Sequence, residues 1–329
     1  MSTADVAASA GVSAGRGRLW LRLAGVRDYG IVVSFLVLFV ALSSSSDVFL
    51  TKTNLLNILD QWSPTLIVAA GATIVFVAGG FDLSIGSIFG LAGVVAASLV
   101  SDVGVALALV LGVGVGVVCG LGNGLLSTVG RINPFIATLA TMMMILGVAF
   151  VISDGNLITV SDPGFSELGT GTLLGVSYAI WVGGLFVAAC GFLLSRTVFG
   201  RFVFAAGGNP EAAWLSGVSV NRVRALAFTV GGGAAGLAGV IVASRVSTGQ
   251  GDAGGLNFAL DAVTGVVLGG TSILGGEGAI WRTVLGVLLL ALIGNGFNLL
   301  GMDTTYQRIV QGSIILAAVS LDAWAKARN

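Results

Sequence analysis

The sequence predicts an all-α polytopic membrane protein that crosses the bilayer about ten times. Of its 329 residues, 56% are hydrophobic and only 9% are charged, whereas a soluble domain carries about 25% charged residues. Because so little charge cannot cover a globule of this size, the chain must present apolar surface to lipid. The 52 glycines agree with this interpretation, since small residues let transmembrane helices approach closely.

Ten apolar segments are long enough to cross the bilayer, or nearly so where a helix is broken. They cover residues 29–42, 64–78, 83–100, 103–129, 135–152, 176–194, 225–243, 259–274, 280–300 and 309–324. The second follows an amphipathic stretch, 54–61. The second and eighth are short and flanked by glycine, so eight or nine full passes also fit, with some segments broken or re-entrant. A transmembrane domain is therefore expected over residues 29–325.

The basic residues predict that both termini are cytoplasmic. With the N-terminus inside and ten passes, only Lys52, Arg245 and Arg308 of the 15 Lys and Arg residues fall outside, which leaves twelve inside. Lysine and arginine accumulate in cytoplasmic loops. The polar tail 1–28 and the end 326–329 are therefore expected in the cytoplasm. The tail has no short apolar core with a cleavage site, so no secretory signal peptide is expected. The expected location is the cytoplasmic (inner) membrane.

Several kinds of chemistry have no residues to support them. The chain has no histidine, and its two cysteines lie in apolar runs without zinc-site spacing, so no metal site or cofactor is expected. The glycines at 270 and 275 have the spacing of a nucleotide-binding loop, but Gly276 follows where that loop needs lysine. The net charge is zero, which gives no signal for nucleic acid.

A short helix is predicted inside the largest cytoplasmic loop, 195–224. Asn209 suits the N-cap position and Pro210 the first turn. Glu211 would follow in the first turn, where the helix dipole favours an acid, and Gly217 can end the helix. A capped helix exposed in a loop is either a plain connector or a docking element for a partner.

Asp82 lies between the second and third apolar segments, in the sequence GGFDLSIGS. A carboxylate at membrane depth is costly and therefore suggests a function. The structural interpretation is that Asp82 caps the third helix with help from Ser84. The functional interpretation is that this break lines a pathway for a polar solute. The two roles are compatible.

Uncharged polar residues also lie within or beside the spans. They are Asn123, Asn133, Thr138, Asn295 and Asn298. An asparagine amide both donates and accepts hydrogen bonds, as sugar hydroxyls do, but the same residues often join helices to one another. A weak internal echo relates segment 75–87 to segment 266–278, because each places Gly-Gly after a short apolar run. Broken segments in both halves are typical of transporters built from repeats.

Several motifs in order resemble the ribose-type branch of ABC permeases. GGFDLSIGS at 79–87 is similar to the signature of that branch. The segments RINPFIATLATM, GRFVFAAGGNPEAAWLSGVSV, LDAVTGVVLGGTSILGGEG and NGFNLLG follow in the order of the family, and the resemblance runs from about residue 54 to 311. The pattern EAAxxxG at 211–217 looks like the motif that import permeases present to their ATPase. The longer Ile-x-Leu-Pro tail of other importer branches is absent, which leaves the docking geometry open.

The resemblance implies a transport subunit rather than an enzyme. Two permease copies, identical or paralogous, would work in membrane lipid with ABC ATPase subunits inside and a sugar-binding protein outside, and would import a pentose, hexose or polyol. The outside loops around 154–167 and 245–257 would receive the binding protein. The residues expected at the ATPase interface are Gly208, Asn209, Pro210, Glu211, Ala212, Ala213 and Gly217. Those expected along the solute pathway are Asp82, Ser84, Asn123, Asn133, Asn295 and Asn298.

Two other classes stay open on the sequence alone. A secondary transporter would need ion-coordinating acids deep in several spans, and the only candidates, Asp82, Asp261 and Glu277, lie at predicted span ends or breaks. A membrane-embedded enzyme would need a nucleophile, base or metal cluster, for which a chain without histidine has few residues.

Overall fold

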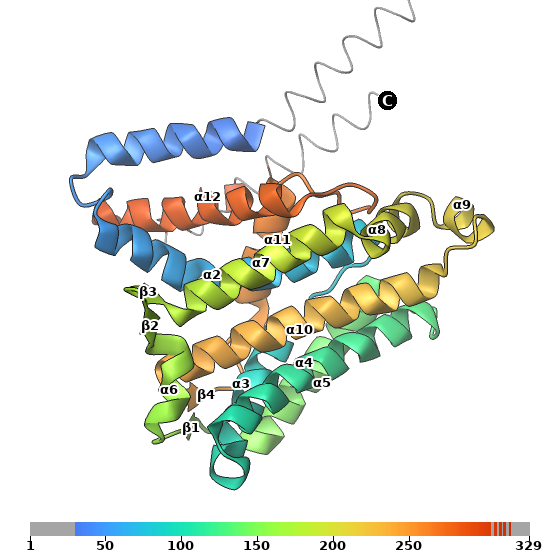
Figure 1. The fold of residues 1–329 in the computed structure, drawn as a ribbon, viewed down its shortest axis with the longest axis horizontal. Helices are drawn as coiled ribbons and strands as arrows, with labels where there is room; N and C mark the ends of the chain where they lie inside the picture. The colour runs from blue at the N-terminus through green and yellow to red at the C-terminus, as the bar shows by residue number, and fades with distance from the viewer. Residues whose placement is uncertain (1–29, 304–305, 308, 311, 314–315, 317–329) are drawn as a thin grey trace, which may run out of the picture.

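The chain forms a bundle of long helices with very little strand (Figure 1). The computed structural model describes residues 30–303, 306–307, 309–310, 312–313 and 316. After a first helix, Gly30–Ser45, the helices are α2 (Lys52–Val77), α3 (Ile85–Val103), α4 (Val105–Thr128), α5 (Pro134–Ser153), α6 (Pro163–Thr170), α7 (Tyr178–Arg196), α8 (Val198–Gly208), α9 (Pro210–Leu215), α10 (Val220–Val246), α11 (Gly255–Leu268) and α12 (Ile280–Leu299). The strands β1 (Ile158–Thr159), β2 (Thr172–Leu173), β3 (Val176–Ser177) and β4 (Thr248–Gly249) have two residues each.

Seven of these helices are long and apolar enough to cross a membrane. They are α2, α3, α4, α5, α7, α10 and α12, and three shorter apolar helices accompany them: Gly30–Ser45, α8 and α11. Nine of the ten predicted segments coincide with a helix, whereas the tenth, 309–324, lies mostly outside the described residues. The tails 1–28 and 326–329 also lie outside them. The count of about ten spans and the cytoplasmic position of the termini therefore stay predictions.

The amphipathic stretch 54–61 and the second apolar segment form one continuous helix, α2, with Pro64 inside it. A proline has no N–H to donate to the carbonyl four residues earlier, here that of Asp60. Two side chains take over that carbonyl: Ser63 Oγ donates to it at 2.9 Å and Arg245 Nη2 donates at 2.9 Å. Arg245 Nη2 also lies 3.2 Å from Asp60 Oδ1. The helix continues through Pro64 with that carbonyl satisfied by Ser63 of α2 and Arg245 of α10.

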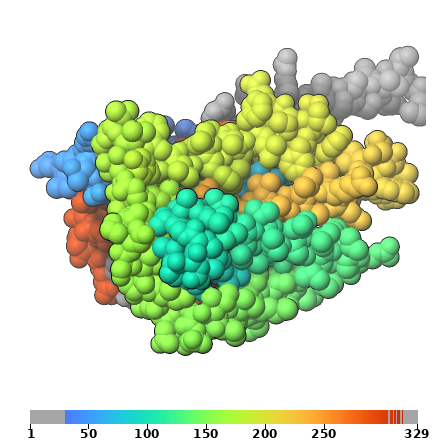
Figure 2. All heavy atoms as spheres, turned by 60° about the horizontal axis from the view of Figure 1, so that its bottom comes forward, coloured from blue at the N-terminus to red at the C-terminus, as the bar shows by residue number. Residues whose placement is uncertain are grey.

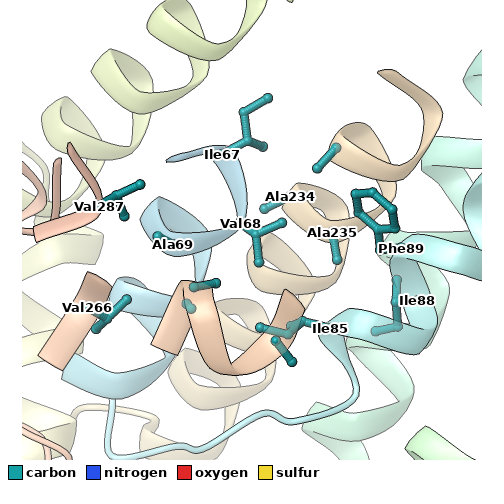
Figure 3. Close-up of a cluster of buried hydrophobic side chains, with 14 of the residues drawn as sticks. Ile67, Val68, Ala69, Ile85, Ile88, Phe89, Ala234, Ala235, Val266 and Val287 are labelled. Atoms are coloured by element: carbon teal, nitrogen blue, oxygen red, sulfur yellow. The ribbon is translucent and has the colours of Figure 1, made fainter. Parts of the chain in front are cut away.

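The helices divide into a central group and a peripheral group. Buried residues make up 72% of the apolar stretch of α2 but only 17% of that of α5. The main core cluster joins α2, α3, α10, α11 and α12, as Figure 3 shows for Ile67, Phe89, Ala234, Val266 and Val287. Helices α4 and α5 cover much of one face in Figure 2. Their exposed valines, leucines and methionines are suited to lipid.

Glycines let α4 and α10 pack backbone to backbone. Gly116 and Gly120 of α4 face Gly232 and Gly236 of α10, and a Cβ at Gly120 would lie 2.9 Å from the Cα of Gly232. Such close approach increases van der Waals contact between the helices. In a membrane this contact drives helix association, because lipid tails are as apolar as the side chains and the hydrophobic effect contributes little. Part of the high glycine content of the chain therefore lies at the contact between α4 and α10.

The polar connections collect at two ends of the bundle. The predicted outside loops meet at one end, where β1 pairs antiparallel with β4 and Val160 N donates to Ser247 O. Ser244 Oγ, which is fully buried, donates to Phe165 O and accepts from Gly169 N. Helices α8 and α9 of the predicted inside loop lie at the opposite end (Figure 1). The inside loop is therefore largely helical, with two short helices and the first turn of α10.

Candidate coupling and transport sites

The predicted short helix of the inside loop is present as α9. Asn209 is its N-cap, with Oδ1 accepting from Ala212 N at 3.0 Å, and Pro210 occupies the first turn. Glu211 follows in that turn. The chain leaves the helix at Gly217, whose φ of 86° is a conformation that favours glycine. The local signals in the sequence were sufficient to place this helix.

Helix α9 presents an apolar and acidic surface at its end of the bundle. Trp214 is 67% exposed and Leu215 is 72% exposed, while Ala213 anchors the helix in a buried cluster. Glu211 and Ala212 are exposed as well. An open concavity of about 640 Å³ lies beside Trp214, lined also by Pro210 and Arg224. Exposed aromatic and aliphatic side chains around a concave surface are typical of a docking site.

The residues just before α9 pack against a break in the centre of the bundle. A Cβ at Gly207 would overlap the carbonyl oxygen of Val77, the last residue of α2, and would lie 2.7 Å from the backbone nitrogen of Gly276. Gly276 N itself donates to Val77 O at 2.9 Å. The end of α8, the α2–α3 break and the α11–α12 break therefore meet backbone to backbone.

Arg224 stabilises the contact between these backbone segments. Its Nε donates to Ala78 O at 3.0 Å and its Nη2 donates to Ala206 O at 3.1 Å. Carbonyls at the C-terminal ends of helices carry partial negative charge and have no partner within the helix. One guanidinium, with its fixed fork of donors, thus joins the ends of α2 and α8. The two segments of the internal echo, 75–87 and 266–278, are in contact here.

Asp82, Ser84 and Asn123 form one buried hydrogen-bonded cluster. Ser84 donates to Asp82 Oδ1 from its backbone N at 2.8 Å and from Oγ at 2.6 Å. Asn123 Nδ2 of α4 donates to Ser84 Oγ at 2.7 Å. All three residues are at most 1% exposed. Asp82 therefore fixes the backbone just before α3. The N-cap of α3 is Ser84, and it makes no side-chain capping hydrogen bond, so the expected cap by Asp82 itself is not formed. The Oδ2 of Asp82 makes no hydrogen bond among the described residues.

Thr138 of α5 closes the same break from the other side. Leu83 N donates to Thr138 Oγ1 at 3.3 Å. The one hydroxyl proton of Thr138 is shared between Pro134 O of its own helix at 2.9 Å and Phe81 O of the break at 3.2 Å. Thr138 is fully buried. The break between α2 and α3 is thereby connected to α4 through Asn123 and to α5 through Thr138. A displacement of the break would therefore strain its hydrogen bonds to both peripheral helices.

Asn295 lies far from this cluster, in a second polar region. It exchanges hydrogen bonds with Asn54 of α2, with Asn54 Nδ2 donating at 3.2 Å and Asn295 Nδ2 donating at 2.8 Å. The pair lines a cavity of about 290 Å³ between α2 and α12. The amide side chains around this cavity are Asn54, Asn57, Gln61, Asn295, Asn298 and Gln307.

The predicted pathway residues thus fall into three places rather than one. Asp82, Ser84 and Asn123 come together at the central break, and Asn295 and Asn298 line the amide cavity. Asn133 instead caps α5, where its Oδ1 accepts from Phe135 N at 3.0 Å. Sequence reasoning missed Arg224 and the amides of α2. The polar stripe in the amphipathic stretch 54–61 was the signal that could have revealed the latter.

Comparisons with known proteins place the chain among permeases. A family model described as "Branched-chain amino acid transport system / permease component" matches residues 54–319. The ribose import permease protein RbsC of Escherichia coli strain K12 is 40% identical over 314 residues, which are 93% of this chain and 97% of that protein. RbsC of Bacillus subtilis strain 168 is 42% identical over 300 residues, 90% of this chain and 93% of that protein.

A relative named for a different sugar is similar to the same extent. The L-arabinose ABC transporter permease protein AraH of Azospirillum brasilense is 39% identical over 314 residues, 94% of this chain and 91% of that protein. No solved structure matches the chain. The relatives are membrane permease subunits, and the family model and the relatives each cover most of the chain. The resemblance carried by the motifs is confirmed: the chain belongs to the ribose-type family of ABC transporter permeases.

Proposed function

We propose that this chain is the permease subunit of an ABC importer and moves a monosaccharide across the cytoplasmic membrane. A separate ATPase subunit would supply the energy. The observation that carries the proposal is α9, a capped helix with exposed Trp214 and Leu215 whose flanking residues contact the central break. A helix in this position can transmit a movement of the ATPase to the helices that surround the solute.

The solute class follows from the relatives and from the polar residues. The relatives are named for ribose and L-arabinose, and a ribose-like pentose, a hexose or a polyol fits the chain. At the central break, Ser84, Asn123 and Thr138 offer hydroxyl and amide groups. The charged groups there are the carboxylate of Asp82 and the guanidinium of Arg224, which binds backbone carbonyls. A neutral sugar needs hydrogen-bond partners in place of its water but little net charge.

The same proposal assigns the partners. Two permease copies, identical or close paralogues, enclose the pathway, and two ATPase subunits bind the α9 ends. A sugar-binding protein binds the opposite end, where the β1–β4 pair joins the two long loops into one surface. That arrangement places α9 in the cytoplasm and the β1–β4 pair outside, in accordance with the basic residues near α9.

Reconstitution tests the proposal. Liposomes that contain only this chain should show no concentrative uptake of labelled ribose or arabinose. Addition of the ATPase, ATP and the binding protein should produce uptake against a gradient. Accumulation by this chain alone, driven by a proton or sodium gradient, would show instead that it is a secondary transporter.

A further inference from the structure

A polar cavity lies between α2 and α12, away from the central break. Its walls come from the first half of α2 and the last half of α12, together with Gln307. The Arg245–Asp60 contact joins this half of α2 to the end of α10, the end that also carries β4. The cavity therefore lies toward the end of the bundle at which the binding protein is expected.

The lining of the cavity is amide-rich and, among the described residues, uncharged. Six of its lining side chains are those of asparagine or glutamine, and no described lysine, arginine, aspartate or glutamate contributes. Each amide offers two donors and an acceptor with two lone pairs, which matches the donor and acceptor pairs of vicinal hydroxyl groups. An ion would find no counter-charge here, so the lining selects for a neutral, polyhydroxylated solute.

Trp62 adds the apolar part of such a site. It is partly buried and contacts the main core cluster while it also lines the cavity. A tryptophan ring presents a broad apolar face, against which the C–H face of a sugar ring can pack. Small-molecule sites combine this type of surface with a few well-placed polar groups.

Two features hold the cavity open and shaped. The reciprocal hydrogen bonds of Asn54 and Asn295 fix one wall, because each amide uses its donor and its acceptor on the other. Gly294 leaves room for Gln307, whose Nε2 would lie 3.0 Å from a Cβ at that position. Among the described residues, Asn57, Gln61, Asn298 and Gln307 make no side-chain hydrogen bond to the protein, so their amides are free for a solute.

We propose that this cavity is a binding site for one neutral monosaccharide near the outer end of the permease. Its volume of about 290 Å³ is close to the lower end of the range for ligand sites, which run from about 300 to 1,000 Å³, so the cavity suits a small solute such as a pentose or hexose. The inference rests on the proposed function and specifies it: solute released from the binding protein would occupy the amide cavity before it reaches the central break.

Tryptophan fluorescence of the purified full-length chain tests the site. D-Ribose and L-arabinose, added at millimolar concentration, should change the emission in a saturable way, and Trp62→Phe should abolish that change. Asn57→Leu and Asn298→Leu, on different helices, should each weaken binding about three- to tenfold, since each removes one or two net hydrogen bonds. Thr53→Val, on an exposed part of α2 outside the cavity, should bind normally, and ribose 5-phosphate should not compete.

The outcomes separate this inference from the proposed function. If no sugar changes the fluorescence, or if the change persists in Trp62→Phe and in both leucine variants, the site is wrong, even when the complete importer takes up sugar normally. If the complete importer takes up no sugar, the proposed function fails, and a titration that depends on Trp62 and the amides would still establish the cavity as a site.

Discussion

The Nε of Arg224, in the first turns of α10, donates a 3.0 Å hydrogen bond to the carbonyl of Ala78, 146 residues earlier in the chain. The same guanidinium binds Ala206 O through Nη2. Ala78 is the C-cap of α2 at the central break, and Ala206 lies in α8, three residues before the cap of α9. This one side chain therefore joins the helix that leads into the proposed docking helix to the segment that precedes Asp82.

Arg224→Lys should uncouple ATP hydrolysis from transport. A lysine has a single ammonium group and cannot reproduce the two-armed geometry of the guanidinium, so the ends of α2 and α8 can move apart. We expect uptake to fall about tenfold in the complete importer while ATPase activity and complex assembly persist. Arg196→Lys, at the exposed end of α7, is the matched control. A parallel loss of uptake and ATPase activity would contradict a coupling role.

Glu211→Lys and Gly217→Val should each weaken the association of the permease with the ATPase. The first reverses the charge in the first turn of α9, where the helix dipole favours an acid. The second forces a β-branched residue to a φ of 86°, at a cost of about 1–2 kcal/mol. Co-purification of the ATPase with the permease and ATP-dependent uptake measure the effect.

The control for Gly217→Val is Gly175→Val. Gly175 has a similar φ of 75° and open space around it, but it lies in the turn between β2 and β3. This variant carries the same backbone strain and should still bind the ATPase. Full assembly and full uptake by both Glu211→Lys and Gly217→Val would rule out α9 as the docking helix.

Asp82→Ala should reduce uptake without removing the protein from the membrane. The substitution leaves Ser84 N and Ser84 Oγ, both buried, without their acceptor, and each buried donor left unpaired costs about 1–3 kcal/mol. Asp82→Asn keeps an acceptor oxygen and should retain the fold of the break. Uptake and membrane content are measured for both, with Asp102→Ala at the exposed end of α3 as the control. Normal uptake by Asp82→Ala would leave Asp82 with a structural role alone.

Gly120→Ala should destabilise the protein, whereas Gly122→Ala should not. A Cβ at Gly120 would overlap Phe228 O and press on Gly232, and such overpacking costs about 1–3 kcal/mol. Gly122 lies two residues away on α4 with no atom within 4 Å of its Cβ position. The thermal transition in detergent, followed by size-exclusion chromatography, compares the two. Equal transitions would show that α4 does not pack against α10 as described.

Pro64→Ala should partly compensate for Arg245→Ala. Alanine restores an N–H that can donate to Asp60 O, the carbonyl that Arg245 Nη2 otherwise binds at 2.9 Å. Loss of Arg245 leaves that carbonyl with Ser63 Oγ as its remaining donor, a loss of about 0.5–1.5 kcal/mol for one hydrogen bond, and this part of the loss should shrink in the Pro64→Ala background. Thermal stability of the four proteins of the double-mutant cycle gives the coupling. Strict additivity would show that Arg245 acts only through the Asp60 carboxylate.

The features that the sequence alone determined are local or compositional. Too little charge to cover a globule predicts a membrane protein, and apolar runs predict where helices lie. The docking helix was also readable, because Asn209, Pro210 and Gly217 act on their own backbone within a few residues. By contrast, which face of α4 or α5 is buried was not readable, since lipid-facing and core-facing residues are equally apolar.

Tertiary structure decided the contacts between residues far apart in the chain. Asp60 is bound by Arg245, Asn54 by Asn295 and Ala78 by Arg224, and each pair is set by how helices cross rather than by spacing along one helix. The amide cavity exists because two polar stripes, each ordinary by itself, face one another. The contacts at the central break were decided in the same way. Glycines 207 and 276 let three backbone segments meet there, and any side chain at these positions would hold the segments apart.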